Sequence, residues 1–270
     1  MSNPDYMADY VLEKLGISVV EDLLLLDEIV YARGAILHEC SMEGSEARLL
    51  LGPGKPIISV SSSPLIDPHR RRFSIAHELG HLEMHRGKNL MKSCTTIDIQ
   101  ESTNTLINSA EHEANQFASA FLIPERFVKI PFSKSEPSFD VINDWATKLR
   151  TSITSTSLRF TQFTCEPIAV IYSFRGTIKY FRSSSEFEDL GVFPKVNSFV
   201  GVCTGASKLF SGQKIPQRWQ EVRASQWFRN DENAFDRNDT IREWSIGMPN
   251  FEAVLSLLWV NEPLGQNCGW

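Results

Sequence analysis

The sequence predicts an α+β protein of two successive domains, and three observations lead to that prediction. Two helical segments precede three short strand-like runs and further helices follow them, an order typical of an α+β fold. From Glu166 onward the texture changes to strand-like runs, and five of the six tryptophans lie in this part. A length of 270 residues accommodates two ordinary domains. We therefore expect one domain over residues 1–164 and a second over residues 165–270.

The first domain begins with two expected helices, over residues 5–15 and 20–33, and Gly34 closes the second. Three strands are expected next, at residues 35–40, 48–51 and 56–60. Gly52-Pro53-Gly54 supplies a turn between the last two, and we expect a small antiparallel sheet. A strand beside a cleft can bind a peptide as an extra strand, and the strand ending near Val60 could take this role.

A long helix is expected over residues 68–86. Asp67-Pro68 supplies an N-cap and a proline at the first helical position, and Gly87 stands where a helix-terminating glycine belongs. Apolar residues cover most of its circumference, which predicts a buried helix. Gly80 costs about 1 kcal/mol of helix stability relative to alanine. We interpret it as room for a neighbouring strand or for substrate.

A second helix is expected after residue 109, because apolar residues recur there at helical spacing and Pro124 ends the pattern. These apolar positions are Ala110, Ala114, Phe117, Ala118 and Phe121. Residues 139–160 are also expected to be helical, with a further helix starting within 155–159.

The second domain should contain a β-hairpin, with strands at 168–172 and 177–181 around Phe174-Arg175-Gly176. Another strand is expected at 200–202. The aromatic residues of this domain could line a pocket for a small molecule, although a tryptophan-rich core is the commoner explanation.

Residues 77–81 read His77-Glu78-Leu79-Gly80-His81 and place two imidazoles one helical turn apart, about 40° around the axis. Both rings can reach one metal ion, which would also supply the partners that buried polar groups need. Glu78 can hold a water molecule against that metal and take its proton. Glu111 from the second helix would be the third ligand, with Asn115 on the same face as its hydrogen-bonding partner.

The alternative is a core helix whose two histidines are satisfied by other groups. Glu113 points about 160° away from Glu111, so the two cannot easily share one site, and we expect Glu113 to be solvated. His85 continues the series 77, 81, 85 but lies two turns from His77. We expect a buried hydrogen-bonding residue that supports the site, not a ligand. His112 is expected on the surface.

Two runs in this part of the chain resemble the ImmA/IrrE family of bacterial metallopeptidases. Residues 71–82, RRFSIAHELGHL, are similar to the family's RRFTIAHELGHL. Residues 111–118, EHEANQFA, followed by Leu122-Ile123-Pro124, are similar to ExEANxFAxxLLMP. The resemblance covers about residues 20–130. The stretch between the motifs, residues 88–110, is long and polar and contains Cys94.

This resemblance implies a zincin-like peptidase domain with Zn²⁺ held by His77, His81 and Glu111 and with Glu78 as general base; Mn²⁺ is a candidate substitute. Family members cut a transcriptional repressor and so release genes for stress response or mobile-element transfer. Some carry a GAF-like sensory domain after the peptidase domain. The sequence thus predicts a zinc endopeptidase acting on a DNA-binding repressor. The alternative is a non-catalytic regulatory protein that binds such a partner through a peptidase-like fold.

Composition, charge and cysteine spacing indicate the class of protein and its compartment. The hydrophobic content is 42%, the net charge −6 and the pI about 5.6, so direct nucleic-acid binding through a basic face is not expected. The five cysteines form no Cys-x-x-Cys motif, which predicts reduced thiols. The sequence contains neither a transmembrane-length apolar run nor a basic start followed by an apolar stretch. We expect a cytoplasmic protein.

Overall fold

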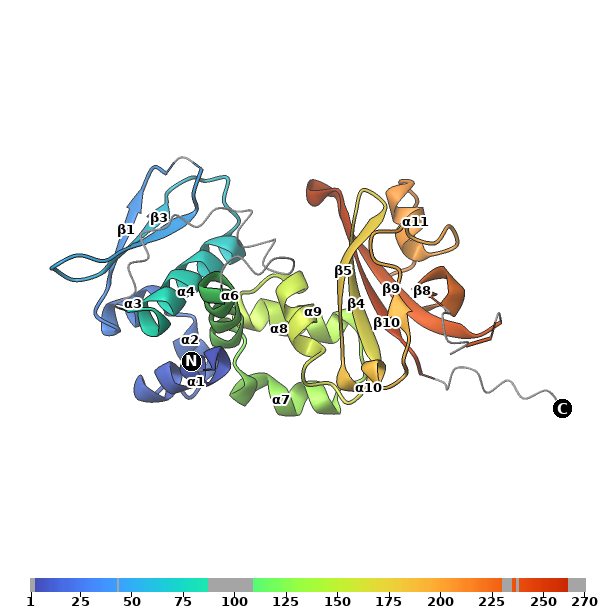
Figure 1. Cartoon of the computed structure of the whole chain (residues 1–270), viewed down its shortest axis with the longest axis horizontal. Coiled ribbons are helices and arrows are strands. Elements are labelled where there is room, and N and C mark those ends of the chain that lie inside the picture. Colours follow the sequence, from blue (N-terminus) through green and yellow to red (C-terminus); the bar gives the residue numbers. More distant parts are fainter. Residues whose placement is uncertain (1–2, 43, 87–108, 230–234, 237, 262–270) are drawn as a thin grey trace. The chain divides into compact units, whose positions relative to one another are not determined.

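The computed structural model describes residues 3–42, 44–86, 109–229, 235–236 and 238–261 (Figure 1). The chain forms two compact units, one of residues 1–128 and 145–155, the other of residues 129–144 and 156–270. Both units mix helices with a sheet, and the second is rich in β-structure, which confirms the α+β prediction. The domain boundary at residue 164 stays a prediction.

Three helices open the first unit: α1 (Pro4–Lys14), α2 (Val20–Leu23) and α3 (Leu26–Ala32). The single helix expected over 20–33 is wrong, because the chain breaks between α2 and α3. At the break, the Arg72 guanidinium donates hydrogen bonds to the carbonyl oxygens of Leu23 and Leu24, at 3.3 and 3.1 Å. A distant arginine therefore satisfies carbonyl groups at the end of α2, which local periodicity could not predict.

The sheet of the first unit has the order β1-β3-β2. Its strands are β1 (Ile36–Cys40), β2 (Ala47–Leu50) and β3 (Ile57–Ser61). The strand positions are confirmed but the antiparallel arrangement is wrong in one pairing. β3 runs antiparallel to β2, with Ala47 opposite Val60, but parallel to β1, with Ile36 opposite Ile57. β3 is therefore the central strand with both edges paired, and an added peptide strand could bind only at β1 or β2.

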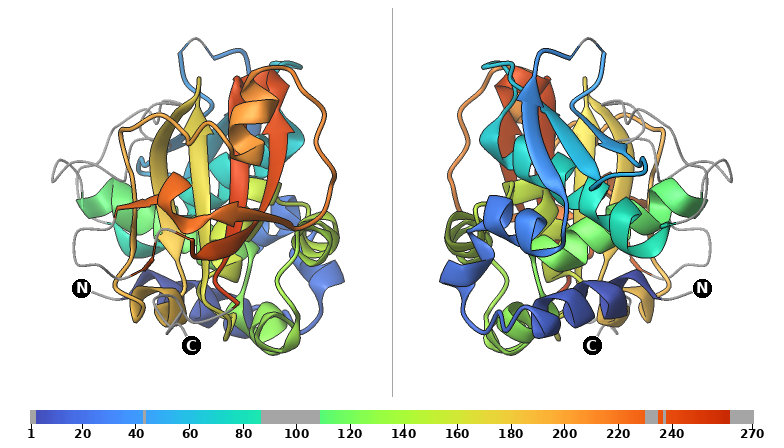
Figure 2. Two further views of the ribbon diagram at one scale, coloured as in Figure 1. Left: turned by 90° about the vertical axis from the view of Figure 1, so that its right-hand side faces the viewer. Right: turned by 90° about the vertical axis from the view of Figure 1, so that its left-hand side faces the viewer.

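The long helix α4 (Pro68–Met84) packs against β2 and β3 (Figure 2, right). Its N-terminus is capped as predicted: Asp67 Oδ1 accepts hydrogen bonds from the backbone N–H groups of His69 and Arg70, at 2.8 and 3.3 Å. Gly87, expected as the C-terminal glycine, lies outside the described residues. The described C-cap is His85.

The second long helix, α6 (Ser109–Leu122), lies alongside α4. A Cβ atom added at Gly80 would lie 3.0 Å from Cδ1 of Phe117 on α6. The space at Gly80 is therefore filled by a neighbouring helix, and the expectation of a strand or substrate there is wrong. The missing side chain allows the two helices to approach closely.

Three further helices follow: α7 (Glu125–Lys134), α8 (Phe139–Leu149) and α9 (Ile153–Phe160). The helical stretch expected over 139–160 is divided at Arg150, whose φ of +51° is left-handed and incompatible with a continuing α-helix.

The second unit contains an antiparallel sheet in the order β5-β4-β10-β9-β7 (Figure 1). Its strands are β4 (Ile168–Phe174), β5 (Thr177–Ser183), β7 (Gln220–Arg223), β9 (Thr240–Met248) and β10 (Ala253–Trp259). The predicted hairpin is confirmed, and its turn residues Arg175 and Gly176 have φ values of +46° and +78°. Two positive φ values suit the right-handed twist of a short hairpin.

Short elements complete the second unit, and they are α10 (Ser185–Glu188), β6 (Phe193–Pro194), α11 (Gly205–Phe210), β8 (Phe228–Arg229) and the 3-10 helices η1 (Ala224–Gln226) and η2 (Pro249–Phe251). The strand expected at 200–202 is wrong. Only Phe199 pairs there, through an isolated bridge to Thr177.

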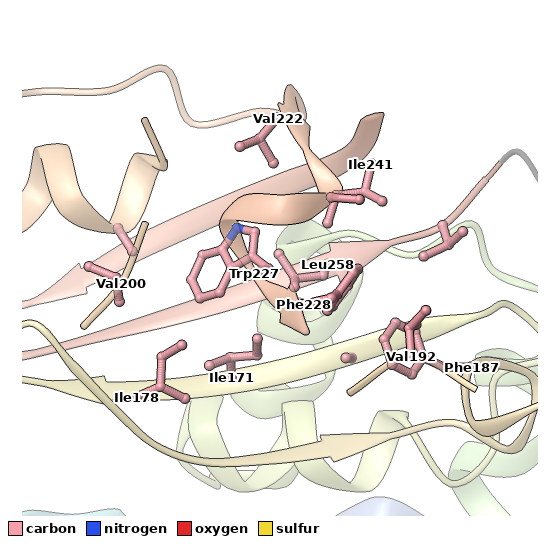
Figure 3. Packing of buried hydrophobic residues seen from close by; sticks show 14 of the residues in the cluster. Ile171, Ile178, Phe187, Val192, Val200, Val222, Trp227, Phe228, Ile241 and Leu258 are labelled. Carbon is pink, nitrogen blue, oxygen red and sulfur yellow. The ribbon is translucent and has the colours of Figure 1, made fainter. Parts of the chain in front are cut away.

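Most described tryptophans of the second unit are packing residues. Trp227 is fully buried in the core on one face of the sheet, with Ile171 and Leu258 (Figure 3). On the opposite strand faces, the Trp219 ring lies 5.9 Å from that of Trp244 and 5.6 Å from that of Trp259, between centroids. These contacts agree with a tryptophan-rich core.

Candidate metal centre

Three side chains from α4 and α6 converge on one point. His77 Nε2 lies 3.1 Å from His81 Nε2, and Glu111 Oε2 lies 3.2 Å from the first and 3.4 Å from the second. The three residues can offer one ligand atom each within 4.8 Å of one another. Within the described ranges this is the single group of three such side chains that could hold a metal ion.

Helix geometry explains the convergence. His77 and His81 are one turn apart on α4, and their rings meet edge to face with centroids 4.7 Å apart. Glu111 lies in the first turn of α6, beside that edge of α4. Both histidines and Glu78 are buried, and Glu111 keeps 14% of its side chain exposed. The site is therefore shielded by the helices but open at the carboxylate.

A hydrogen bond fixes the orientation of the first imidazole. His77 Nδ1 lies 2.9 Å from Asn115 Oδ1, one helical turn after Glu111 on α6. An amide oxygen can only accept, so His77 Nδ1 carries the proton and donates. In the neutral ring, Nε2 then presents its lone pair toward the point of convergence. Asn115 thus lies where the sequence placed it, but it contacts the histidine ligand.

The second imidazole is oriented through another histidine. His85 Nε2 lies 2.9 Å from a carboxylate oxygen of Glu113, and His85 Nδ1 lies 3.1 Å from His81 Nδ1. Because Glu113 accepts, the neutral His85 ring carries its proton on Nε2 and accepts at Nδ1. His81 Nδ1 must then be the donor, which leaves the lone pair of its Nε2 facing that of His77.

With these proton positions, the site suits a metal ion. Two imidazole lone pairs and a carboxylate oxygen face one another at 3.1–3.4 Å, and in these forms all three atoms are acceptors. A cation satisfies such a set, whereas a hydrogen-bond network would need a donor among the three atoms. Two nitrogens and one carboxylate oxygen are a donor set that suits zinc.

The charge state of Glu111 agrees with that role. Burial by itself raises the pKa of this carboxyl group. In the forms in which His77 and His81 donate to Glu111 instead of holding a metal ion, their hydrogen bonds and charge outweigh burial and hold the pKa of the carboxyl group well below its usual range. Glu111 is therefore ionised near neutral pH, as a carboxylate ligand must be.

Glu113 corrects one sequence-based expectation. It was expected to be solvated, but only 16% of its side chain is exposed and it pairs with the buried His85. Glu113 is two residues after Glu111 on α6 and does point away from it. It faces the C-terminal end of α4, where His85 lies, and not the solvent. The sequence held one signal for this contact. His85 is predicted to be buried and hydrogen-bonded, so it needs a polar partner, and no such partner is named for it. His112, expected on the surface, is exposed.

The arginine run before the site is tied to the rest of the first unit. Arg70 Nε donates to Glu46 Oε2 at 2.7 Å, and the same oxygen accepts from Ser74 Oγ at 2.9 Å. Arg71 pairs with Glu39 and lies 3.6 Å from Asp27. These contacts anchor the first turns of α4 to the segments around the sheet, and so help to position the histidines that follow.

The cysteines in the described ranges, Cys40, Cys165 and Cys203, form no disulfide bond. Cys94, in the long segment between the two motifs, lies outside the described residues. No helix in the described ranges has the length and apolar character needed to cross a membrane.

Part of the chain is similar to a known protein family, and its fold is similar to that of a solved structure. Residues 32–160 match the model of the peptidase M78 family, described as the IrrE N-terminal-like domain. No curated protein matches the chain. A solved structure of a Mycobacterium tuberculosis transcriptional regulator is similar, with a TM-score of 0.58 over 96% of this chain and 77% of that chain. At 15% identity, this likeness shows a shared fold.

Proposed function

Because residues 32–160 belong to the peptidase M78 family as an IrrE N-terminal-like domain, we propose that the protein is a zinc-dependent endopeptidase with a narrow protein substrate. The observation that carries the proposal is the set of three convergent acceptors, His77 Nε2, His81 Nε2 and Glu111 Oε2. Three protein ligands leave a fourth position open, which is typical of catalytic zinc and not of structural zinc.

In this proposal His77, His81 and Glu111 hold the ion, and Mn²⁺ is the candidate substitute. Bound zinc supplies a Lewis acid for the scissile carbonyl and lowers the pKa of a coordinated water to about 7. Glu78, on α4 between the histidines, takes a proton from the attacking water and returns it to the leaving amine. Glu78 is itself buried in the first unit.

The proposed substrate is a DNA-binding transcriptional repressor, whose cleavage would release genes for stress response or mobile-element transfer. The family resemblance supports this choice. The structural neighbour is itself a transcriptional regulator, although its 15% identity supports the fold alone. Free thiols and the absence of a membrane-spanning helix among the described residues agree with the proposed cytoplasmic setting.

The test is a survey of new protein N-termini in cells that make either the wild type or Glu78→Gln. The substitution keeps the size of the side chain but removes the base, so we expect zinc to stay bound and substrate-derived N-termini to disappear. Glu13→Gln, at an exposed glutamate of α1, is the matched control and should cleave normally.

Two outcomes would contradict the proposal. Full cleavage by Glu78→Gln would remove Glu78 from the mechanism. Equal regulation of the partner by Glu78→Gln and wild type, without new N-termini, would favour the alternative of a non-catalytic protein that binds its partner through a peptidase-like fold.

A further inference from the structure

A buried relay of three side chains lies behind the proposed metal site. It begins at His81, continues through His85, the C-cap residue of α4, and ends at Glu113 on α6. The His85 side chain is 1% exposed and that of Glu113 16% exposed. Glu113 belongs to neither the ligand set nor the proposed catalytic step, so its burial against a histidine needs an explanation of its own.

From this geometry we propose that Glu113 is a positioning residue that orients His81 through His85. The carboxylate accepts the His85 Nε2 proton, which makes His85 Nδ1 an acceptor for the Nδ1–H group of His81. His81 is thereby held in the tautomer whose Nε2 lone pair faces His77 and Glu111. Residues that accept from a metal-bound histidine commonly change metal affinity by about 10–100-fold when they are removed.

The two histidine ligands are supported differently. His77 donates directly to the neutral amide of Asn115, at 2.9 Å, whereas His81 reaches its carboxylate only through a second imidazole. A neutral imidazole can shift its proton from one nitrogen to the other, so His85 transmits an orientation to His81 only while its own tautomer is fixed. Glu113 is the group that fixes it.

Removing the Glu113 carboxylate should therefore allow the rings of both His85 and His81 to change orientation. Without Glu113, the buried Nε2–H of His85 loses its hydrogen bond to that carboxylate, and the loss of a buried hydrogen bond costs free energy in a low-dielectric interior. The ring can then turn or adopt the other tautomer, and His81 loses its fixed Nδ1 acceptor. The expected consequence is a mixture of His81 orientations, of which only some present Nε2 to a metal ion.

The first measurement is zinc affinity, by competition with a chromophoric chelator, for the full-length wild type, Glu113→Ala, Glu113→Gln and the control His112→Gln. Alanine removes the acceptor and should raise the zinc dissociation constant about 10–100-fold. Glutamine keeps a side-chain oxygen that can accept from His85 and should restore most of the affinity. His112 is the exposed neighbour of Glu113 and should have no effect.

The second measurement reads the tautomer directly. In the metal-free protein, ¹⁵N chemical shifts of the histidine rings report which nitrogen is protonated. We expect His81 to be protonated at Nδ1 in the wild type and to be mixed in Glu113→Ala. A general loss of folding would affect other histidine rings and circular dichroism as well, so this measurement separates positioning from damage.

The inference rests on the proposed zinc site, but the two can fail separately. A wild type that does not bind zinc would overturn the proposed function, while the tautomer of His81 would still test the relay. A wild type that binds zinc, with equal affinity and an unchanged His81 tautomer in Glu113→Ala, would overturn the inference alone.

Discussion

The contact between Gly80 and Phe117 predicts that the conservative substitution Gly80→Ala is harmful. The added Cβ would lie 3.0 Å from Cδ1 of Phe117 and 3.2 Å from both its Cβ and Cγ. Carbon atoms pack best at roughly 3.5–4.0 Å, so three contacts would each be too short by about 0.3–1 Å. Either α4 or α6 must move.

The phenylalanine has little room to retreat. Phe117 is fully buried and stacks on Phe121, with ring centroids 5.5 Å apart and an interplanar angle of 11°. Overpacking of this kind costs about 1–3 kcal/mol. Replacing a helical glycine by alanine recovers about 1 kcal/mol. The expected net effect of Gly80→Ala is a loss of about 1 kcal/mol in the free energy of unfolding.

The same substitution should weaken metal binding, because α6 carries both Phe117 and Glu111. Urea unfolding of the metal-free protein, followed by circular dichroism, measures the stability change, and chelator competition measures the zinc affinity. Phe117→Ala, alone and combined with Gly80→Ala, is the control, because it removes Cγ and Cδ1, two of the three atoms in the close contact. The smaller side chain should make the glycine substitution less costly. Equal stability and equal zinc affinity in Gly80→Ala would refute the close-contact argument.

Two further predictions concern a helix cap and a pair of tyrosines. Asp67→Ala removes the acceptor for two N–H groups of α4 and should cost about 1 kcal/mol in urea unfolding, whereas Asp67→Ser should keep most of that stability. Burial raises the pKa of both Tyr172 and Tyr180, whose rings stack 5.0 Å apart, so the folded state favours their neutral forms. Their contribution to stability is therefore complete below the unfolded tyrosine pKa of about 10 and is lost as the pH rises toward the folded value. In an alkaline titration followed by the absorbance of ionised tyrosine, we expect part of the absorbance increase to occur only when the protein unfolds. Complete ionisation of the tyrosines in the folded protein would contradict this prediction.

The metal ligands could be predicted from sequence because their geometry is local. His77 and His81 share a face through helical periodicity alone, and the same periodicity places Glu111 and Asn115 on one face of α6. What the sequence left open was the pairing between the helices. Asn115 was predicted to form a hydrogen bond with Glu111, whereas in the structure Asn115 is hydrogen-bonded to His77.

Features that depend on distant contacts were not predictable in this way. The alternation of apolar and polar residues along a strand indicates which face is buried, but it does not indicate whether the neighbouring strand runs parallel or antiparallel. The parallel pairing of β1 with β3 was therefore not predicted. The break after α2 leaves carbonyl groups that Arg72 satisfies from nearly fifty residues away. Glu113 looked solvated because its partner, His85, lies on the other helix.

These observations describe α4 and α6 as one functional unit. Each described histidine of the series 77, 81 and 85 contacts a side chain of α6, and the two helices approach closely because Gly80 has no side chain. A metal ion held by both helices would therefore stabilise their docking, and the free energy of binding would depend on the same helix separation that Phe117 sets. The effects of Gly80→Ala and Glu113→Ala should consequently appear in metal affinity for different reasons: the first moves Glu111 away from the histidines, and the second lets His81 turn.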